Sequence, residues 1–336
     1  MKTKNRFIIE FSLFSRYRTE LMGGAVFGVV IAHFLLYSQH EMHIINFTSR
    51  LIYTQGLLFL SGFGLYYSYS NDKNIIRFYK KRINRLYMPF VLISFVFLLC
   101  HVLRQKESIW DFFAYLTTIA FWYKGNYYGM WYVAVSLLLY LIYPFIYKFL
   151  FYKESNLLFR SICVTAIMFI LFVIIYKYNP NSWDKIGDWI SKTPMFPLGI
   201  ITGYLAKKSC KFTTLQFVVY IIVMLFLHVV IKQINHCNEI VKMINVLMGM
   251  PLILICFSAI DNIKSFKWIL SFFRYMGKYS LEIYLLHLLI YWSWYQISPM
   301  NETWRYLITM VITGILCKPI HDIINKLQKS RFYLLK

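Results

Sequence analysis

Charged residues are scarce in this sequence, and acidic residues are the scarcest of them. Only 15% of the 336 residues are charged, with 14 Asp and Glu against 36 Lys and Arg, whereas 59% are hydrophobic. Soluble domains average about 25% charged and about 45–50% apolar residues. The composition therefore argues against a soluble domain and indicates a membrane protein.

Cysteine motifs and targeting signals are also missing. None of the six cysteines belongs to a CxxC pair, so we expect neither a disulfide framework nor a metal site. The N-terminus lacks the short apolar segment and the small-residue cleavage site of a secretory signal. The net charge of +22 comes without the signature of any nucleic-acid-binding module, so nucleic acid is not an expected partner.

Long apolar runs recur along the whole chain. Most have about 17–22 residues, which is the length needed to cross a hydrocarbon core of ~30 Å. We expect an all-α polytopic membrane protein, one domain over 1–336, with about ten transmembrane helices. These lie near 21–38, 46–69, 88–103, 129–147, 158–176, 194–206, 214–231, 243–260, 279–297 and 304–325. The shorter apolar stretch 110–122 is predicted to be an interfacial or re-entrant helix.

Basic residues are distributed unevenly between alternate loops. One set of loops, with both tails, holds 25 of the 36 Lys and Arg, and the opposite set holds nine. Cytoplasmic loops carry the excess of Lys and Arg. We therefore expect both termini in the cytoplasm, with tails over 1–20 and 326–336. We expect the bilayer to be the cytoplasmic (inner) membrane of a bacterium, and a composition rich in Lys, Ile, Asn, Phe and Tyr is consistent with an AT-rich bacterial genome.

One histidine lies deep in the first apolar run. His33 is twelve residues beyond Leu21, about 18 Å along a helix. Ionisable groups at such depth usually mark a cavity or a pathway. The neutral ring can accept a proton, which suits catalysis, or it can form a hydrogen bond between helices for packing. Both interpretations stay open at this stage.

Two further polar groups stand out. Arg82 and Arg85 are three residues apart, on one helical face, just before Pro89 opens the third run. Such a pair suits phosphate capture, although anchoring to anionic lipid is the commoner use. Tyr284 and His287 share one face of the ninth run, while Glu282 lies roughly 140° round from His287, so we expect no direct pairing between those two.

Six sequence blocks, taken in this order, resemble the acyltransferase-3 family of integral membrane O-acyltransferases, of the polysaccharide O-acetyltransferase type. They are ELMGGAVFGVVIAHF, LFLSGFGLYYSY, RINRLYMP, WYVAVSLLLYLIYP, FPLGIITGYLAKK and GKYSLEIYLLH. The resemblance covers nearly the whole chain and corresponds to the transmembrane part of the family.

This resemblance implies transfer of an acyl group, usually acetyl, from cytoplasmic acyl-CoA to a carbohydrate hydroxyl. The carbohydrate is a capsule, exopolysaccharide, lipopolysaccharide, peptidoglycan or small glycoside. In that family His33 would be the catalytic group, acting as general base or as an acyl-carrying nucleophile. Arg82 and Arg85 would handle the acyl donor. Acetyl-CoA is then a cosubstrate, with no permanently bound cofactor, and glycan-assembly proteins are further expected partners.

The sequence departs from the family at one position. Relatives often have an arginine eleven residues before the histidine, where this chain has Met22. Arg18 lies one turn earlier on a similar face, and we hypothesise that its long side chain takes over the role.

Further candidates for orienting the substrate are Tyr284, His287, Glu282 and Ser61, and Trp131 is a candidate for stacking on a sugar ring. Two other functions remain open: a transporter of glycans or lipid-linked sugars, and a membrane partner without catalytic activity. Transporters tend to show two related halves and charges near the midplane, neither of which is evident in this sequence.

Overall fold

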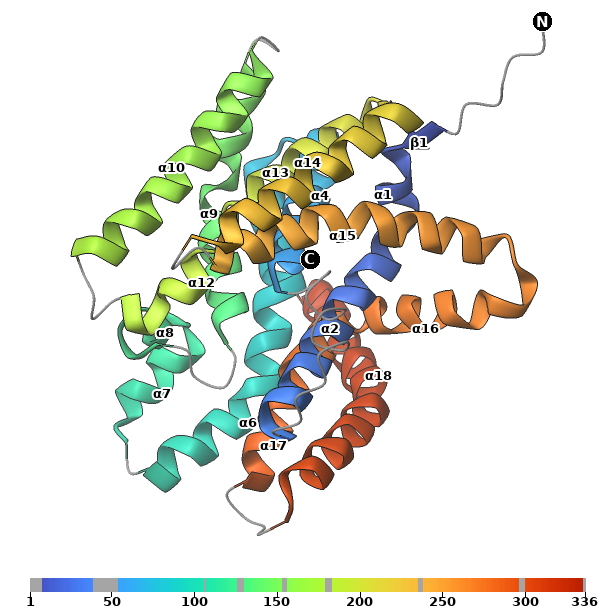
Figure 1. Ribbon diagram of the computed structural model, residues 1–336. Helices are drawn as coiled ribbons and strands as arrows, with labels where there is room; N and C mark the ends of the chain where they lie inside the picture. Colours follow the sequence, from blue (N-terminus) through green and yellow to red (C-terminus); the bar gives the residue numbers. More distant parts are fainter. Residues whose placement is uncertain are drawn as a thin grey trace, which may run out of the picture.

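The computed structural model describes residues 8–38, 54–105, 107–125, 130–152, 156–178, 183–234, 238–295 and 300–334. Helices dominate these residues, and two short strands pair into one antiparallel sheet (Figure 1). The longer helices are α2 (Arg18–Ser38), α4 (Thr54–Asn71), α6 (Met88–Gln105), α9 (Trp131–Leu150), α10 (Leu157–Tyr178), α13 (Met195–Lys207), α14 (Thr214–Lys232), α15 (Asn238–Asp261), α17 (Ser280–Tyr295) and α18 (Glu302–Leu334).

The shorter elements connect these helices. They are β1 (Ile8–Glu10), α1 (Ser12–Arg16), α5 (Ile75–Arg82), the π-helix η1 (Ile83–Tyr87), α7 (Ile109–Leu116), α8 (Ile119–Lys124), the π-helix η3 (Trp183–Gly187), α12 (Asp188–Ile190), β2 (Lys211–Thr213), the 3₁₀-helix η4 (Lys264–Phe266) and α16 (Lys267–Lys278).

Seven helical stretches among the described residues are long and apolar enough to cross a membrane. They are Arg18–Tyr37, Ile75–Gln105, Trp131–Leu150, Leu157–Ile175, Thr214–Lys232, Ile240–Asp261 and Glu302–Lys329. The chain is therefore a helical, multi-pass membrane protein. Helices α4, α13 and α17 lie at three further expected spans but do not meet the same criterion of length and hydropathy, so the count of ten stays a prediction.

The third span begins earlier than the sequence suggested. We expected Pro89 to open it, but α5, η1 and α6 form one continuous helix from Ile75, where the side chain of Asn74 accepts a hydrogen bond from the backbone of Arg77. Proline has no backbone N–H, and its ring crowds the preceding turn of an α-helix. The wider π-helical turn directly before Pro89 accommodates that ring, so the helix continues through it.

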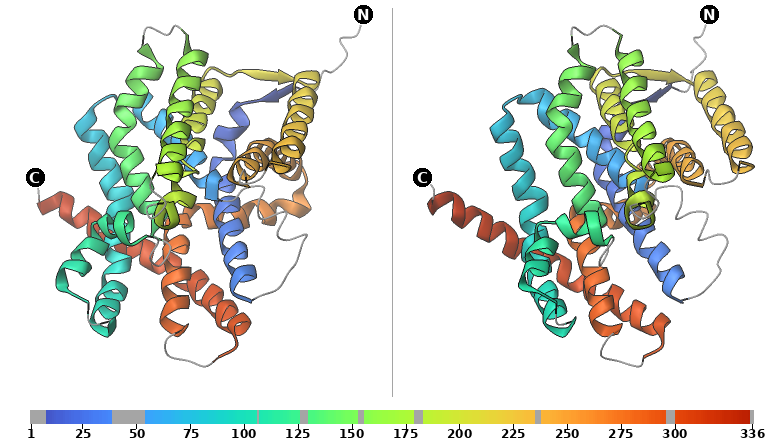
Figure 2. Two further views of the ribbon diagram at one scale, coloured as in Figure 1. Left: turned by 60° about the vertical axis from the view of Figure 1, so that its left-hand side comes forward. Right: turned by 90° about the vertical axis from the view of Figure 1, so that its left-hand side faces the viewer.

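Segments expected to be tails or loops also contain regular structure. Residues 8–20 of the expected N-terminal tail form β1, α1 and the start of α2, and β1 pairs with β2 through Ile8 opposite Thr213 and Glu10 opposite Lys211. Residues 326–334 of the expected C-terminal tail continue α18, which crosses α6 and extends beyond it (Figure 2). Residues 1–7, 335 and 336 of these tails, and 46–53 of the second expected span, lie outside the described residues.

Two close helix crossings depend on glycine. A Cβ added at Gly23 of α2 would collide with the backbone of Phe273 in α16, and one at Gly277 with the backbone of Thr19. Gly62 of α4 and Gly199 of α13 form an equivalent crossing. Helices approach this closely in membranes when small residues line the contact. The loop expected over 261–278 is thus largely the helix α16, packed against the start of α2.

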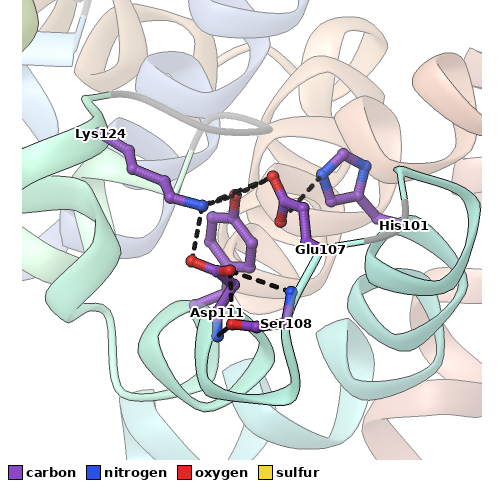
Figure 3. Close-up of polar contacts among 6 residues, drawn as sticks. His101, Glu107, Ser108, Asp111 and Lys124 are labelled. Atoms are coloured by element: carbon purple, nitrogen blue, oxygen red, sulfur yellow. Dashed lines mark hydrogen bonds and ion pairs between the residues drawn. The ribbon is translucent and has the colours of Figure 1, made fainter.

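The stretch 110–122 forms the two short helices α7 and α8. Ser108 caps α7 in a reciprocal capping box with Asp111. A charged cluster joins α7 and α8 to α6 (Figure 3): Lys124 Nζ lies 2.8 Å from Asp111 Oδ1 and 3.5 Å from Glu107 Oε1. Glu107 Oε2 also lies 3.8 Å from His101 Nε2. Two short helices held in this way agree with the expectation of a non-spanning segment.

Candidate active site

Two histidines from different helices meet inside the bundle. His33 Nδ1 of α2 lies 2.9 Å from His287 Nε2 of α17, with the ring centroids 5.2 Å apart. Helix α17 packs against α2, α6 and α18, and its residues 282–291 are all buried. His287 is fully buried, whereas His33 keeps part of its surface exposed.

The hydrogen bonds assign the tautomers of both neutral rings. His287 Nδ1 lies 2.8 Å from the carbonyl oxygen of Ile283. A carbonyl oxygen only accepts, so His287 Nδ1 carries the hydrogen and His287 Nε2 keeps a lone pair. That lone pair accepts the hydrogen on His33 Nδ1. The remaining nitrogen, His33 Nε2, therefore holds an unshared lone pair with which it can take a proton.

A cavity of about 100 Å³ brings together three arginines from three different elements. Arg18 begins α2, Arg82 ends α5 and Arg85 lies in η1. The other lining residues are Met22, Val26, Leu57, Ser61, Gly64, Leu86, Tyr132, Tyr140, Ser280, Leu281 and Tyr284. The tertiary structure thus joins Arg18 to the Arg82–Arg85 pair, although 64 residues of sequence separate Arg18 from Arg82.

The positive charge of this cavity is not balanced by the protein residues that line it. No lining residue is acidic, and within the described ranges neither Arg18 nor Arg85 forms an ion pair. Arg82 Nη2 donates to Ser68 Oγ at 3.1 Å. The Nε atoms of Arg18 and Arg82 are buried and have no hydrogen-bond partner among the described residues. Guanidinium groups that share a cavity without carboxylates form a site suited to an anion, and phosphate oxygens match their geometry.

A glycine makes room for the arginine at the start of α2. A Cβ added at Gly64 of α4 would collide with the guanidinium group of Arg18, with Arg18 Cζ at 2.7 Å. Gly62, two residues earlier, faces α13 instead. The two glycines therefore serve two purposes: Gly62 allows close helix packing, and Gly64 shapes the cavity. Ser61 Oγ, one turn before Gly64, lies 2.7 Å from Tyr140 OH across the cavity.

Arg18 and Arg82 are partly buried, whereas Arg85 is exposed. Tyr79 OH, one turn before Arg82, donates to the carbonyl oxygen of Leu141 at 2.7 Å. Leu141 is in the middle of α9, so this hydrogen bond joins α5 to the middle of α9 one turn before Arg82. This position favours ligand binding over anchoring to lipid headgroups, the two uses between which the sequence did not decide.

Two tyrosines lie between the arginines and the histidines. Tyr132 and Tyr284 both line the cavity, with their ring centroids 5.3 Å apart. The Tyr284 ring is 6.1 Å from that of His287, one turn further along α17. On α2, Val26 lines the cavity and precedes His33 by seven residues, about 10 Å along the helix. The cavity therefore ends about 10 Å along α2 from His33, and Tyr284 lies between its lining and His287.

Two candidates from the sequence lie elsewhere. Glu282 is buried against α18, where its Oε1 lies 2.7 Å from His321 Nδ1, and it does not line the cavity. Trp131 is 2% exposed, stacks on Trp189 at 4.7 Å and lies beneath the ammonium group of Lys192. Its ring is covered by the protein itself and is not presented to a sugar.

Sequence reasoning missed Tyr140 as a cavity residue, and it considered Tyr132, beside Trp131, only for stacking on a sugar ring. Their separation of eight residues places them near one face of a helix, which was a usable signal in the block WYVAVSLLLYLIYP. The described residues contain no group of three or more His, Cys, Asp or Glu side chains that could hold a metal ion.

Comparison with known protein families gives a match over most of the chain. A family model described as an acyltransferase domain, of the acyltransferase-3 type, matches residues 23–320. These residues include His33, Arg82, Arg85 and His287, and exclude Arg18. Neither the curated proteins nor the solved structures gave a match.

Proposed function

Because the chain belongs to the acyltransferase-3 family, we propose that it transfers an acetyl group from acetyl-CoA to a hydroxyl of an exported or cell-surface carbohydrate. The protein would lie in the cytoplasmic membrane of a bacterium, with the arginine cavity open to the cytoplasm. The observation that carries this proposal is the His33–His287 pair, which leaves His33 Nε2 free to act as a base, beside an anion site without carboxylates.

The arginine cavity is proposed to hold the phosphates of coenzyme A. Arg85, which is exposed, would receive the nucleotide, while Arg18 and Arg82 lie deeper. The narrow pantetheine arm would then pass Tyr132 and Tyr284, and bring the thioester to His33. Charged hydrogen bonds of this kind contribute about 1.5–3 kcal/mol each.

In the reaction, His33 Nε2 takes the proton of the acceptor hydroxyl as the oxygen attacks the thioester carbon. The carbon–sulfur bond breaks, and the coenzyme A thiolate leaves with the proton that His33 had taken. General base catalysis contributes about 10²–10⁴-fold to such a step. His287 stabilises the transient positive charge on His33 by accepting the hydrogen of Nδ1, and Tyr284 is a candidate donor to the thioester oxygen.

The test is acetyl transfer by the purified protein in lipid nanodiscs, from radiolabelled acetyl-CoA to envelope glycan freed of O-acetyl groups by mild alkali. We expect His33→Gln to lower kcat about 10²–10⁴-fold and to leave the Kd for coenzyme A unchanged. Arg82→Gln should raise that Kd about tenfold or more.

His228→Gln is the matched control, because His228 is another histidine inside an apolar helix, α14, far from the cavity lining. It should behave like the wild type. Full transfer by His33→Gln would contradict the proposed chemistry. Glycan flux that does not depend on acetyl-CoA would support the transporter instead.

A further inference from the structure

A layer of aromatic rings lies on the side of His33 away from the arginine cavity. Tyr37 follows His33 by one turn of α2, and the two rings are 6.0 Å apart and 29° from parallel. The Tyr37 ring stacks on Tyr291 of α17 at 4.3 Å, with an angle of 19°. Trp292 of α17 and Tyr306 of α18 complete the layer, with ring centroids 5.9 Å and 6.0 Å from that of Tyr37.

Two of these four rings are buried in the protein, and the other two are partly exposed. Tyr291 and Tyr306 are 1% and 0% exposed, and Tyr306 OH donates to the carbonyl oxygen of Val30 at 2.8 Å, which fixes α18 to α2. Tyr37 and Trp292, like His33, keep part of their surface exposed. Tyr37 therefore lies directly beside the His33 ring, and the partly exposed Trp292 packs against Tyr37 and the buried Tyr291.

The aromatic layer and the anion site lie on opposite sides of His33 along α2. Arg18 is 15 residues before His33, about 22 Å, and Tyr37 is about 6 Å beyond it. The cavity ends at Val26 on this helix. An acyl donor held by the arginines therefore reaches His33 from one side and leaves the other side, with the aromatic rings, for the second substrate.

We propose that Tyr37 and Trp292 form the acceptor subsite, where they stack on the apolar face of a pyranose ring and present one of its hydroxyls to His33 Nε2. This inference rests on the proposed function. The C–H groups of a pyranose face pack on aromatic rings, which are rigid and lose little entropy on binding. The stacking role expected for Trp131 thus moves to the outer turns of α2 and α17, because Trp131 is covered by Trp189 and Lys192.

The competing explanation is an interfacial belt, in which tyrosine and tryptophan only locate the helix ends at the membrane surface. Trp110 of α7 is 77% exposed and has no place in the layer, so it serves as the belt control. A belt residue affects insertion and stability, whereas a subsite residue changes the KM for the acceptor.

The experiment measures acetyl transfer from labelled acetyl-CoA to de-O-acetylated envelope glycan as a function of glycan concentration. We expect Tyr37→Ser and Trp292→Ser to raise the KM for the glycan about tenfold, with the Kd for coenzyme A unchanged. Tyr37→Phe, which keeps the ring, should raise this KM much less than Tyr37→Ser does. Trp110→Ser should retain the wild-type KM.

An unchanged glycan KM in Tyr37→Ser and Trp292→Ser, or an equal rise in Trp110→Ser, would overturn the subsite. The unchanged Kd for coenzyme A shows that each variant is folded, and Tyr37→Phe provides a second, milder test. Failure of the proposed function is distinct, because the wild type would then transfer no acetyl group at all.

Discussion

At the scale of single residues, the chemistry of His33 depends on the group bound to the other side of its ring. His287 accepts the hydrogen of His33 Nδ1, and its own hydrogen goes to the carbonyl of Ile283. This chain of two hydrogen bonds holds the imidazole in one tautomer and one orientation. A carboxylate plays the corresponding part in many catalytic triads, whereas in the proposed mechanism a neutral ring would do so in an apolar surrounding.

We predict that His287→Leu lowers kcat for acetyl transfer about 10- to 100-fold, because the protonated His33 loses a hydrogen bond worth about 1.5–3 kcal/mol. His287→Gln should retain most of the activity, since the side-chain carbonyl of glutamine also accepts from Nδ1. Nitrogen-15 NMR of labelled histidine should show a bare Nε2 in the wild type and in His287→Gln, and a mixture of tautomers in His287→Leu. Equal activity of the two variants would contradict the positioning role.

Gly64 provides a second prediction at this scale. In Gly64→Ala the three atoms nearest the new methyl group all belong to the end of the flexible Arg18 side chain, so the protein should fold while the guanidinium is displaced. We expect the Kd for coenzyme A to rise about tenfold, by loss of one charged hydrogen bond. The melting temperature should not fall, because alanine favours a helix by about 0.5–1 kcal/mol over glycine.

Gly314→Ala in α18 is the control for this substitution, since a Cβ there meets nothing within 4 Å. It should keep the wild-type Kd. Titration calorimetry with coenzyme A compares the two variants, and an equal Kd in both would remove Arg18 from the anion site.

At the scale of elements, the charged cluster of Figure 3 joins α7 and α8 to the end of α6. Lys124 is its centre, in contact with Asp111, Glu107 and the hydroxyl of Tyr115. Hydrogen bonds from Lys124 and then from Ser108 hold the pKa of Asp111 below its usual value. The position of these two short helices therefore depends on an ionised carboxylate.

The sign of the pH dependence follows from that shift. An unfolded aspartate has a pKa of about 3.9, and the folded value is lower, so the stabilisation is present above about pH 4 and is lost as the pH falls through the folded pKa. We predict that hydrogen exchange over 109–124 accelerates below pH 4 in the wild type, beyond the intrinsic effect of pH. Asp111→Asn should exchange faster at neutral pH and show no such step. Asp322→Asn, at an exposed position of α18, should match the wild type.

At the scale of the whole molecule, the uneven distribution of Lys and Arg predicts which face meets the cytoplasm. We predict that Trp110→Cys, in a variant otherwise without cysteine, reacts with a membrane-impermeant maleimide in intact spheroplasts. Arg77→Cys, at an exposed position of α5, should react only after permeabilisation. The reverse pattern would place the arginine cavity outside the cell and contradict the use of cytoplasmic acetyl-CoA.

Several features of this protein could be predicted from the sequence because they are local properties of the chain. Apolar runs of membrane-spanning length, the pairing of Arg82 with Arg85 on one face, and the depth of His33 depend only on composition and helical period. Pro89 misled the prediction, since proline usually marks a helix start, and the π-helical turn that accommodates it leaves no clear pattern in the sequence.

By itself, then, the sequence determined a helical membrane protein of the acyltransferase-3 family with a histidine in its first span. Only the tertiary structure decided that Arg18 joins Arg82 and Arg85, that His287 binds His33 while Glu282 turns to His321, and that Trp131 is covered. The physical reason is that helical period tells which residues share a face. It does not tell which neighbouring helix that face meets, because this depends on the rotation and crossing of helices far apart in the chain.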